Sequence, residues 1–157
     1  MNDSAPLTDS SYPPSAFYFK VMFGGPQETV DTSFQEVSGI SSEIEVESVA
    51  EGGENRFVHQ LPKGFKHPNL EMKRGIAPMT SPLVKWCKAV MEKDLIESIE
   101  SKAIRVFLMD ENKKVIRGWL FDSAYPVKWE IESFSSTKNE VAIEKIVFSY
   151  TFSKRIV

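Results

Sequence analysis

Cysteine is almost absent from this chain of 157 residues, and several features that would point to particular functions are missing as well. Cys87 is the single cysteine, which excludes an intrachain disulfide and an all-cysteine metal site and favours folding in a reducing cytosol. No apolar run approaches the roughly 20 residues that a membrane-spanning helix needs. The segment Met1-Asn2-Asp3-Ser4 lacks the basic and apolar regions of a secretory signal. We therefore expect assembly in the cytoplasm and no membrane contact.

A concentrated charge of one sign is also missing. The formal net charge is -3, and the acidic and basic residues are spread along the chain. A nucleic-acid-binding protein would usually carry a clustered basic face, so sequence recognition of nucleic acid is not expected.

Residues that could support catalysis or bind a metal ion are few. His59 and His67 have only Glu54 or Glu71 near them in the sequence, whereas a zinc site needs three or four ligands. Cys87 falls on the apolar stripe of a predicted helix, where a buried structural thiol is the ordinary outcome. We expect no catalytic residue, no metal and no cofactor, and hence a protein that is not an enzyme.

Most of the predicted secondary structure consists of extended segments. Most are separated by turns too short for parallel crossovers, which predicts antiparallel pairing. The fourth segment is expected to end at Pro62-Lys63-Gly64, and the last is expected to be one long strand with Ile146, Phe148, Tyr150 and Phe152 on a single face. The predicted segments are residues 16–23, 32–37, 43–49, 56–61, 69–73, 103–109, 115–121, 127–132 and 141–152.

One helix is predicted, beginning after Ser81 and ending near Asp94. Ser81 is a good N-cap, and Pro82 occupies the first helical position, where its missing N–H costs nothing. Residues 1–15, rich in Ser, Pro, Asp and Thr, predict a flexible N-terminal arm. The rest, residues 16–157, is expected to be one domain: mainly β, an antiparallel β-barrel or sandwich with one flanking α-helix.

The stretch from Gln35 to Glu47 is expected to form a hairpin that bends at Ser38-Gly39. Its second strand alternates acidic and apolar residues, so Glu43, Glu45 and Glu47 share one face. That acidic row suits either an ordinary solvent-exposed sheet or the wall of a water-filled channel. The loop around Gly52-Gly53 lacks the Lys and Ser/Thr of a phosphate-binding loop, so it predicts a flexible turn or a contact with another subunit.

Several motifs, taken in order, resemble the tail tube proteins of contractile phage tails and extracellular contractile injection systems. The resemblance covers nearly all of the chain after the first dozen residues. The motifs are Tyr12-Pro13-Pro14 before Phe17-Tyr18-Phe19-Lys20-Val21, Phe34 to Ile40, Glu43 to Glu47, Glu51 to Pro62, Asn69-Leu70 to Lys73-Arg74-Gly75, Ser81-Pro82-Leu83 with Trp86, and Ala124 to Trp129.

This resemblance implies a tail-tube-like barrel whose copies form stacked homo-hexameric rings inside a contractile sheath, with cargo in the lumen. The sheath and the baseplate or spike proteins of the same phage tail or injection particle are then the expected partners. Both the major tube subunit and a tube-initiator subunit fit the motifs. Six residues are candidates for the lumen face: Glu43, Glu45 and Glu47, or alternatively Lys128, Glu130 and Glu132.

The expected contacts between subunits or rings lie in the glycine-centred loop. They are Glu51, Gly52, Gly53, Glu54, Asn55, Arg56, Phe57 and His59. A different class of function remains open from the residues alone, namely a monomeric ligand-binding β-barrel. Such a barrel would need an apolar interior cavity, which Trp119, Trp129 and Phe148 could line.

Overall fold

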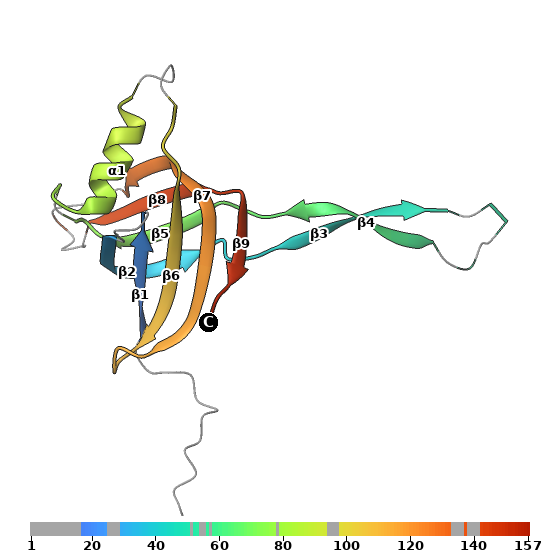
Figure 1. Ribbon diagram of the computed structural model, residues 1–157, viewed down its shortest axis with the longest axis horizontal. Helices are drawn as coiled ribbons and strands as arrows, with labels where there is room; N and C mark the ends of the chain where they lie inside the picture. The colour runs from blue at the N-terminus through green and yellow to red at the C-terminus, as the bar shows by residue number, and fades with distance from the viewer. Residues whose placement is uncertain are drawn as a thin grey trace, which may run out of the picture.

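The computed structural model describes residues 17–24, 29–50, 52–53, 56, 58–77, 79–93, 98–132, 137 and 142–157. Within this part of the chain, antiparallel strands form a barrel, one helix packs on it, and a two-stranded ribbon projects away from it (Figure 1). The predicted arm, residues 1–15, lies outside the described residues.

Six strands form the barrel, because their pairing closes on itself. The order is β6-β1-β2-β5-β8-β7, and β7 pairs back onto β6, with every neighbouring pair antiparallel. The predicted antiparallel barrel with one helix is therefore confirmed. The strands are β1 (Phe17–Phe23), β2 (Thr29–Ser38), β5 (Leu70–Gly75), β6 (Lys102–Asp110), β7 (Val115–Ile131) and β8 (Ile143–Ser149).

Alternation along the strands places large apolar side chains inside the barrel. In β1 and β5, every second residue is buried, as expected for strands with one face toward a core. Phe148 is fully buried and stacks on Trp86 at 5.5 Å between ring centroids. Trp119 and Trp129 are partly buried and pack against the same cluster, so the interior beside these three aromatic residues is filled by core side chains.

The helix α1 (Pro82–Met91) begins as the sequence predicts. The Ser81 hydroxyl accepts a hydrogen bond from the backbone N–H of Val84, and Pro82 is at the first helical position. The helix buries Leu83, Val84, Trp86 and Cys87. Its apolar face thus covers one end of the barrel core, which anchors the helix to the fold (Figure 1).

Two predictions about the last third of the chain are wrong. The segments 115–121 and 127–132 are not separate strands, because β7 runs through both and absorbs Pro126 with a register shift before Lys128. The expected strand 141–152 is broken at Tyr150 and Thr151 into β8 and β9 (Phe152–Arg155). Both β8 and β9 pair with β7, and the chain turns between them. Phe152 is therefore exposed and does not share the buried face of Ile146 and Phe148.

The ribbon consists of β3 (Glu43–Val49) and β4 (His59–Lys66), which pair only with each other among the described strands. The predicted hairpin between Gln35 and Glu47 is therefore wrong. Gly39 adopts a φ of 84° and turns the chain out of the barrel, so that β2 pairs with β5 and not with β3. The expected end of β4 at Pro62 is also wrong, since an edge strand tolerates proline and a bulge accommodates it here.

Candidate assembly surfaces

Every residue of β3 is exposed, and so is nearly all of β4. The ribbon leaves the barrel sideways and touches it only at its root (Figure 1). An isolated two-stranded ribbon is at best marginally stable in water, because it has no third layer on which to bury its apolar side chains. This ribbon is consequently the part of the molecule that most needs a partner.

The two faces of the ribbon differ in chemistry. Residues paired across the strands share a face, which puts Ile44 beside Phe65 and Val46 beside Pro62. Phe65 is 80% exposed, an unusual value for so large an apolar side chain. The sequence pattern of β3 showed the alternation, but the long unpaired ribbon was not evident from it.

The opposite face carries the predicted acidic row. Glu43 and Glu45 lie 3.5 and 3.8 Å from the Lys66 ammonium group, and all three side chains are well exposed. Glu47 pairs with Leu61 across the ribbon. The structure thus brings the three glutamates together, but on the ribbon and not on the wall of the barrel.

Four of the predicted contact residues are described, and they lie toward the far end of the ribbon. Gly52, Gly53 and Arg56 are exposed, and His59 pairs with Val49 at the end of the ladder. Glu51, Glu54, Asn55 and Phe57 lie outside the described residues.

The root of the ribbon is fixed by two features. A side chain at Gly39 would overlap the backbone carbonyl of Asn69, so the two chain crossings at the root lie in direct contact. His67 stacks on Tyr150 at 3.9 Å, and its ring nitrogens lie 3.1 Å from the Pro68 oxygen and 3.2 Å from the Thr151 oxygen. This histidine is within hydrogen-bonding distance of backbone oxygens and holds the root of the ribbon against the corner between β8 and β9.

A second surface lies on the outer face of β5, β8 and the C-terminal half of β7. Lys145 lies 3.5 Å from Glu71 on one side and 3.6 Å from Glu130 on the other. Lys128 reaches Glu130 at 3.1 Å, and Lys73 reaches Glu132 at 2.9 Å. Lys128 and Glu130 of the second predicted set thus belong to a chain of ion pairs that reaches Glu71 through Lys145, and Glu132 pairs separately with Lys73. We call this surface of alternating charge the charged face.

The ionisation of the charged face reflects this pairing. The hydrogen bond from Lys128 is the main cause that lowers the pKa of Glu130, and Lys145 lowers it further. The hydrogen bond to Glu132 is the main cause that raises the pKa of Lys73. Both shifts favour the charged forms, so the face remains a set of ion pairs around neutral pH.

Inside the barrel, sequence analysis missed a buried ionic network. The Arg74 guanidinium bonds Glu144 at 3.1 Å, Asp31 at 2.6 Å and the Ser81 hydroxyl at 3.0 Å. The Trp129 indole N–H donates to Glu144 at 2.7 Å. The network joins four strands to the N-cap of α1.

A signal for this network was present in the sequence. Arg74 follows Leu70 and Met72 on the buried face of β5, and Glu144 precedes Ile146 and Phe148 on that of β8. Opposite charges at two inward positions favour a buried ion pair, although the sequence alone does not show that the two strands are neighbours.

Metal ligands, the single cysteine and long apolar helices were the other features to locate in the described residues. No group of three or more His, Cys, Asp or Glu side chains there could hold a metal ion. Burial raises the pKa of the Cys87 thiol to about 12, which keeps it protonated and inert as the sequence predicts. No helix in the described part is long and apolar enough to cross a bilayer.

A closed barrel with a capping helix and a projecting, exposed ribbon suits a structural subunit that assembles with partners. The comparisons agree with this class. The family model for the T4-like virus tail tube protein gp19 matches residues 15–153, and the chain belongs to that family. A search of curated protein sequences gave no match.

Solved structures show the same fold. A chain of the anti-feeding prophage baseplate superposes with a TM-score of 0.77 at 26% identity, covering 93% of this chain and 97% of its own length. A chain of the PVC sheath–tube complex in the extended state superposes with a TM-score of 0.74 at 21% sequence identity, and the match covers 94% of each chain. Hcp1 from Flavobacterium johnsoniae superposes with a TM-score of 0.56 at 14% sequence identity, and the match covers 88% of this chain and 94% of Hcp1. The predicted family and fold are confirmed, and the protein is a structural tube-type subunit, not an enzyme.

Proposed function

We propose that six copies of this protein close into a ring, and that the rings stack into the inner tube of a phage tail or contractile injection particle. The observation that carries the proposal is the ribbon, whose apolar side chains have no partner within the described subunit. A head-to-tail contact between identical copies closes into a ring when its rotation fits, which covers such a surface without an open fibre in the plane of the ring.

The charged face is the surface that suits a lumen. Its lysines and glutamates neutralise one another at separations of 2.9 to 3.6 Å, so a passing cargo meets neither an apolar patch nor a strong field of one sign. Of the two candidate sets, we therefore place Lys128, Glu130 and Glu132 toward the lumen. Glu43, Glu45 and Glu47 belong with the ribbon and its contacts.

The helix α1 would then face away from the lumen, toward a surrounding sheath. Its buried side packs on the barrel core, and its outer side presents Lys85 and Lys88 to solvent. The ribbon, with Gly52, Gly53, Arg56 and His59 near its end, would reach a neighbouring subunit or the next ring. Assembly in the cytoplasm with sheath and baseplate components fits this role.

Electron microscopy of the purified protein at high concentration tests the assembly. We expect six-fold rings and stacks of rings. A protein that remains a featureless monomer at all concentrations would refute the proposal.

The direction of the two faces is tested separately by labelling assembled tubes with a bulky, protein-coupled maleimide. Lys88→Cys on the helix should react readily, whereas Glu130→Cys on the charged face should react much more slowly. In unassembled protein, the two variants should react alike, and the buried Cys87 contributes no background. Equal labelling of both variants in tubes would show that the charged face does not line the lumen.

A further inference from the structure

Three strands have an entire edge without a paired strand within the described part of the molecule. These strands are β3, β4 and β9, each of which pairs along one side only. The six barrel strands pair with neighbours on both sides, because the barrel is closed. An open strand edge presents unpaired backbone N–H and C=O groups, and these readily pair with another chain. A subunit that assembles with copies of itself can use such edges as joints.

The three edges are not equivalent. β4 contains Pro62, which has no N–H to donate, and its register shift leaves Lys63 without a partner on β3. Both features blunt an edge against pairing. β3 contains neither proline nor glycine, so its seven residues can form a regular ladder along their free side. The edges best suited to pairing are therefore those of β3 and β9.

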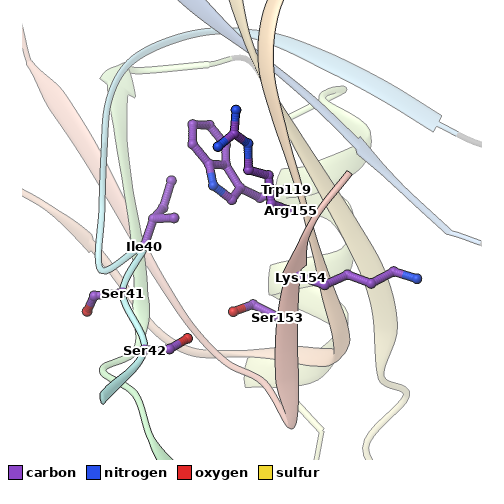
Figure 2. Close-up of a pocket in the computed structure, with 7 residues that line it drawn as sticks. All are labelled: Ile40, Ser41, Ser42, Trp119, Ser153, Lys154 and Arg155. Carbon is purple, nitrogen blue, oxygen red and sulfur yellow. The ribbon is translucent and has the colours of Figure 1, made fainter. Parts of the chain in front are cut away.

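The edge of β9 borders an open slot. Figure 2 shows the segment Ile40–Ser42 on one side of the slot and β9 on the other, with Ile40 and Trp119 between them. The hollow there has a volume of about 220 Å³. A neighbouring hollow of about 360 Å³ lies between β9 and Phe65 at the ribbon root. An extended strand entering the slot would meet an unpaired backbone and two apolar side chains.

The side chains of β3 and β9 are complementary. On β9, the exposed Lys154 lies on the face opposite to Trp119, while Arg155 shares the Trp119 face. β3 carries Glu43, Glu45 and Glu47 on one face, which would lie on the Lys154 side. The other face of β3 presents Ile44 and Val46, which match the Ile40 and Trp119 side chains in the slot. Opposite charges on neighbouring strands stabilise a pair, and like charges disfavour it.

We propose that β3 of one subunit pairs with the free edge of β9 of a second copy, so that each ribbon extends the sheet of its neighbour. This inference rests on the proposed assembly into rings and names the strands that join the subunits. The ribbon then gains the third strand that it lacks in the isolated chain. The contact is head-to-tail, since each copy offers one β3 edge and one β9 edge.

Disulfide trapping tests the pairing in assembled tubes. Lys154→Cys is combined in turn with Glu43→Cys, Glu45→Cys or Glu47→Cys, because the register along the strand is not fixed in advance. At least one pair should form covalent multimers on a non-reducing gel, since a disulfide requires Cβ atoms about 3.8 Å apart. The matched control is Lys154→Cys with Leu61→Cys on β4, which should not cross-link.

A charge exchange tests the same contact without cysteine. Lys154→Glu should raise the protein concentration needed for tube assembly by roughly tenfold or more, because the new carboxylate would repel the glutamates of β3 on the neighbouring copy. Adding Glu45→Lys should restore assembly. Adding Glu92→Lys at the end of α1 instead makes the same net charge change at a distance and should not restore it.

The outcomes separate the two proposals. Tubes that form while none of the three β3 variants cross-links, and while Lys154→Glu assembles like the unmodified protein, would overturn the pairing but leave the tube function intact. A protein that never assembles would overturn both. Circular dichroism of each variant confirms that the barrel is folded before its assembly is scored.

Discussion

The barrel and the ribbon are made from the same antiparallel pairing, yet they differ in what holds them. In the barrel, alternate residues are buried around Phe148, and the Arg74 network ties four strands to α1. In the ribbon, all of β3 is exposed, and only the cross-strand pairs stabilise it. The barrel therefore has a core of its own, whereas the ribbon has none, which is why we propose that another copy completes it.

The largest effect is expected from breaking the buried network. Arg74→Met keeps a similar volume but leaves the Glu144 and Asp31 carboxylates without their cation. Removal of one partner of a buried ion pair costs about 3–5 kcal/mol of unfolding free energy. Urea denaturation of the unassembled protein measures this loss.

Lys73→Met provides the matched control. It removes a cation on the outer face of β5, where the ion pair with Glu132 is partly exposed to solvent, so its loss should cost much less than the loss of Arg74. An equal loss in the two variants would mean that the Arg74 network does not stabilise the barrel.

A smaller effect is expected at the junction between the two regions. Gly39→Ala forces a side chain into the Asn69 carbonyl at a positive φ, which should cost about 1–3 kcal/mol. Gly53 also has a positive φ, but an added side chain there would lie in open space near the end of the ribbon, so Gly53→Ala is the matched control. It should therefore cost less than Gly39→Ala in the same denaturation experiment, and a reversed order would argue against a tight root.

The charged face should contribute still less to folding. Lys145→Met removes the cation between Glu71 and Glu130, and we expect a loss of about 1 kcal/mol or less, measured by thermal unfolding. The loss should shrink further at high salt, because salt screens partly exposed ion pairs. A loss comparable to that of Arg74→Met would mean that this face stabilises the barrel itself.

The smallest effect on folding is expected in the ribbon. Phe65→Ser should change the unfolding free energy of the unassembled protein by no more than about 0.5 kcal/mol, because its side chain is already in water. Its effect on assembly should be large. If the ring covers Phe65, the lost burial of about 1.5–3 kcal/mol raises the assembly concentration roughly 10–100-fold.

Sedimentation of tubes over a concentration series measures this second effect. Ser48→Ala, on the same face of the ribbon, is the control and should assemble as the unmodified protein does. A Phe65→Ser protein that is unstable as a monomer but assembles normally would reverse the distinction between the two regions.

Sequence reasoning recovered the parts of the fold that depend on local signals. Ser81 and Pro82 fix the start of α1, and the alternation in β1 and β5 follows the core. The strand boundaries that depend on which strands pair in the folded protein could not be predicted from the sequence. The break at Tyr150 depends on the course of β7, and the exit of the ribbon at Gly39 depends on β5 lying beside β2.

The candidate surfaces show the same limit. The glutamates of β3 and β7 could both be identified by alternation, but alternation does not tell a barrel wall from a projecting ribbon. The charged face required three strands to be placed side by side before its lysines and glutamates formed pairs. Glu71, Lys73 and Lys145 were therefore missed, although each lies on a strand that was largely predicted.

The ribbon is, by our proposal, the element of the subunit that assembly covers. Hydrogen–deuterium exchange of the β3 and β4 amides, compared between dilute unassembled protein and assembled tubes, tests this directly. We expect fast exchange along the ribbon in the unassembled protein and strong protection in tubes, while the amides of β5 and β8 are protected in both. Ribbon amides that exchange equally fast in both states would contradict the account.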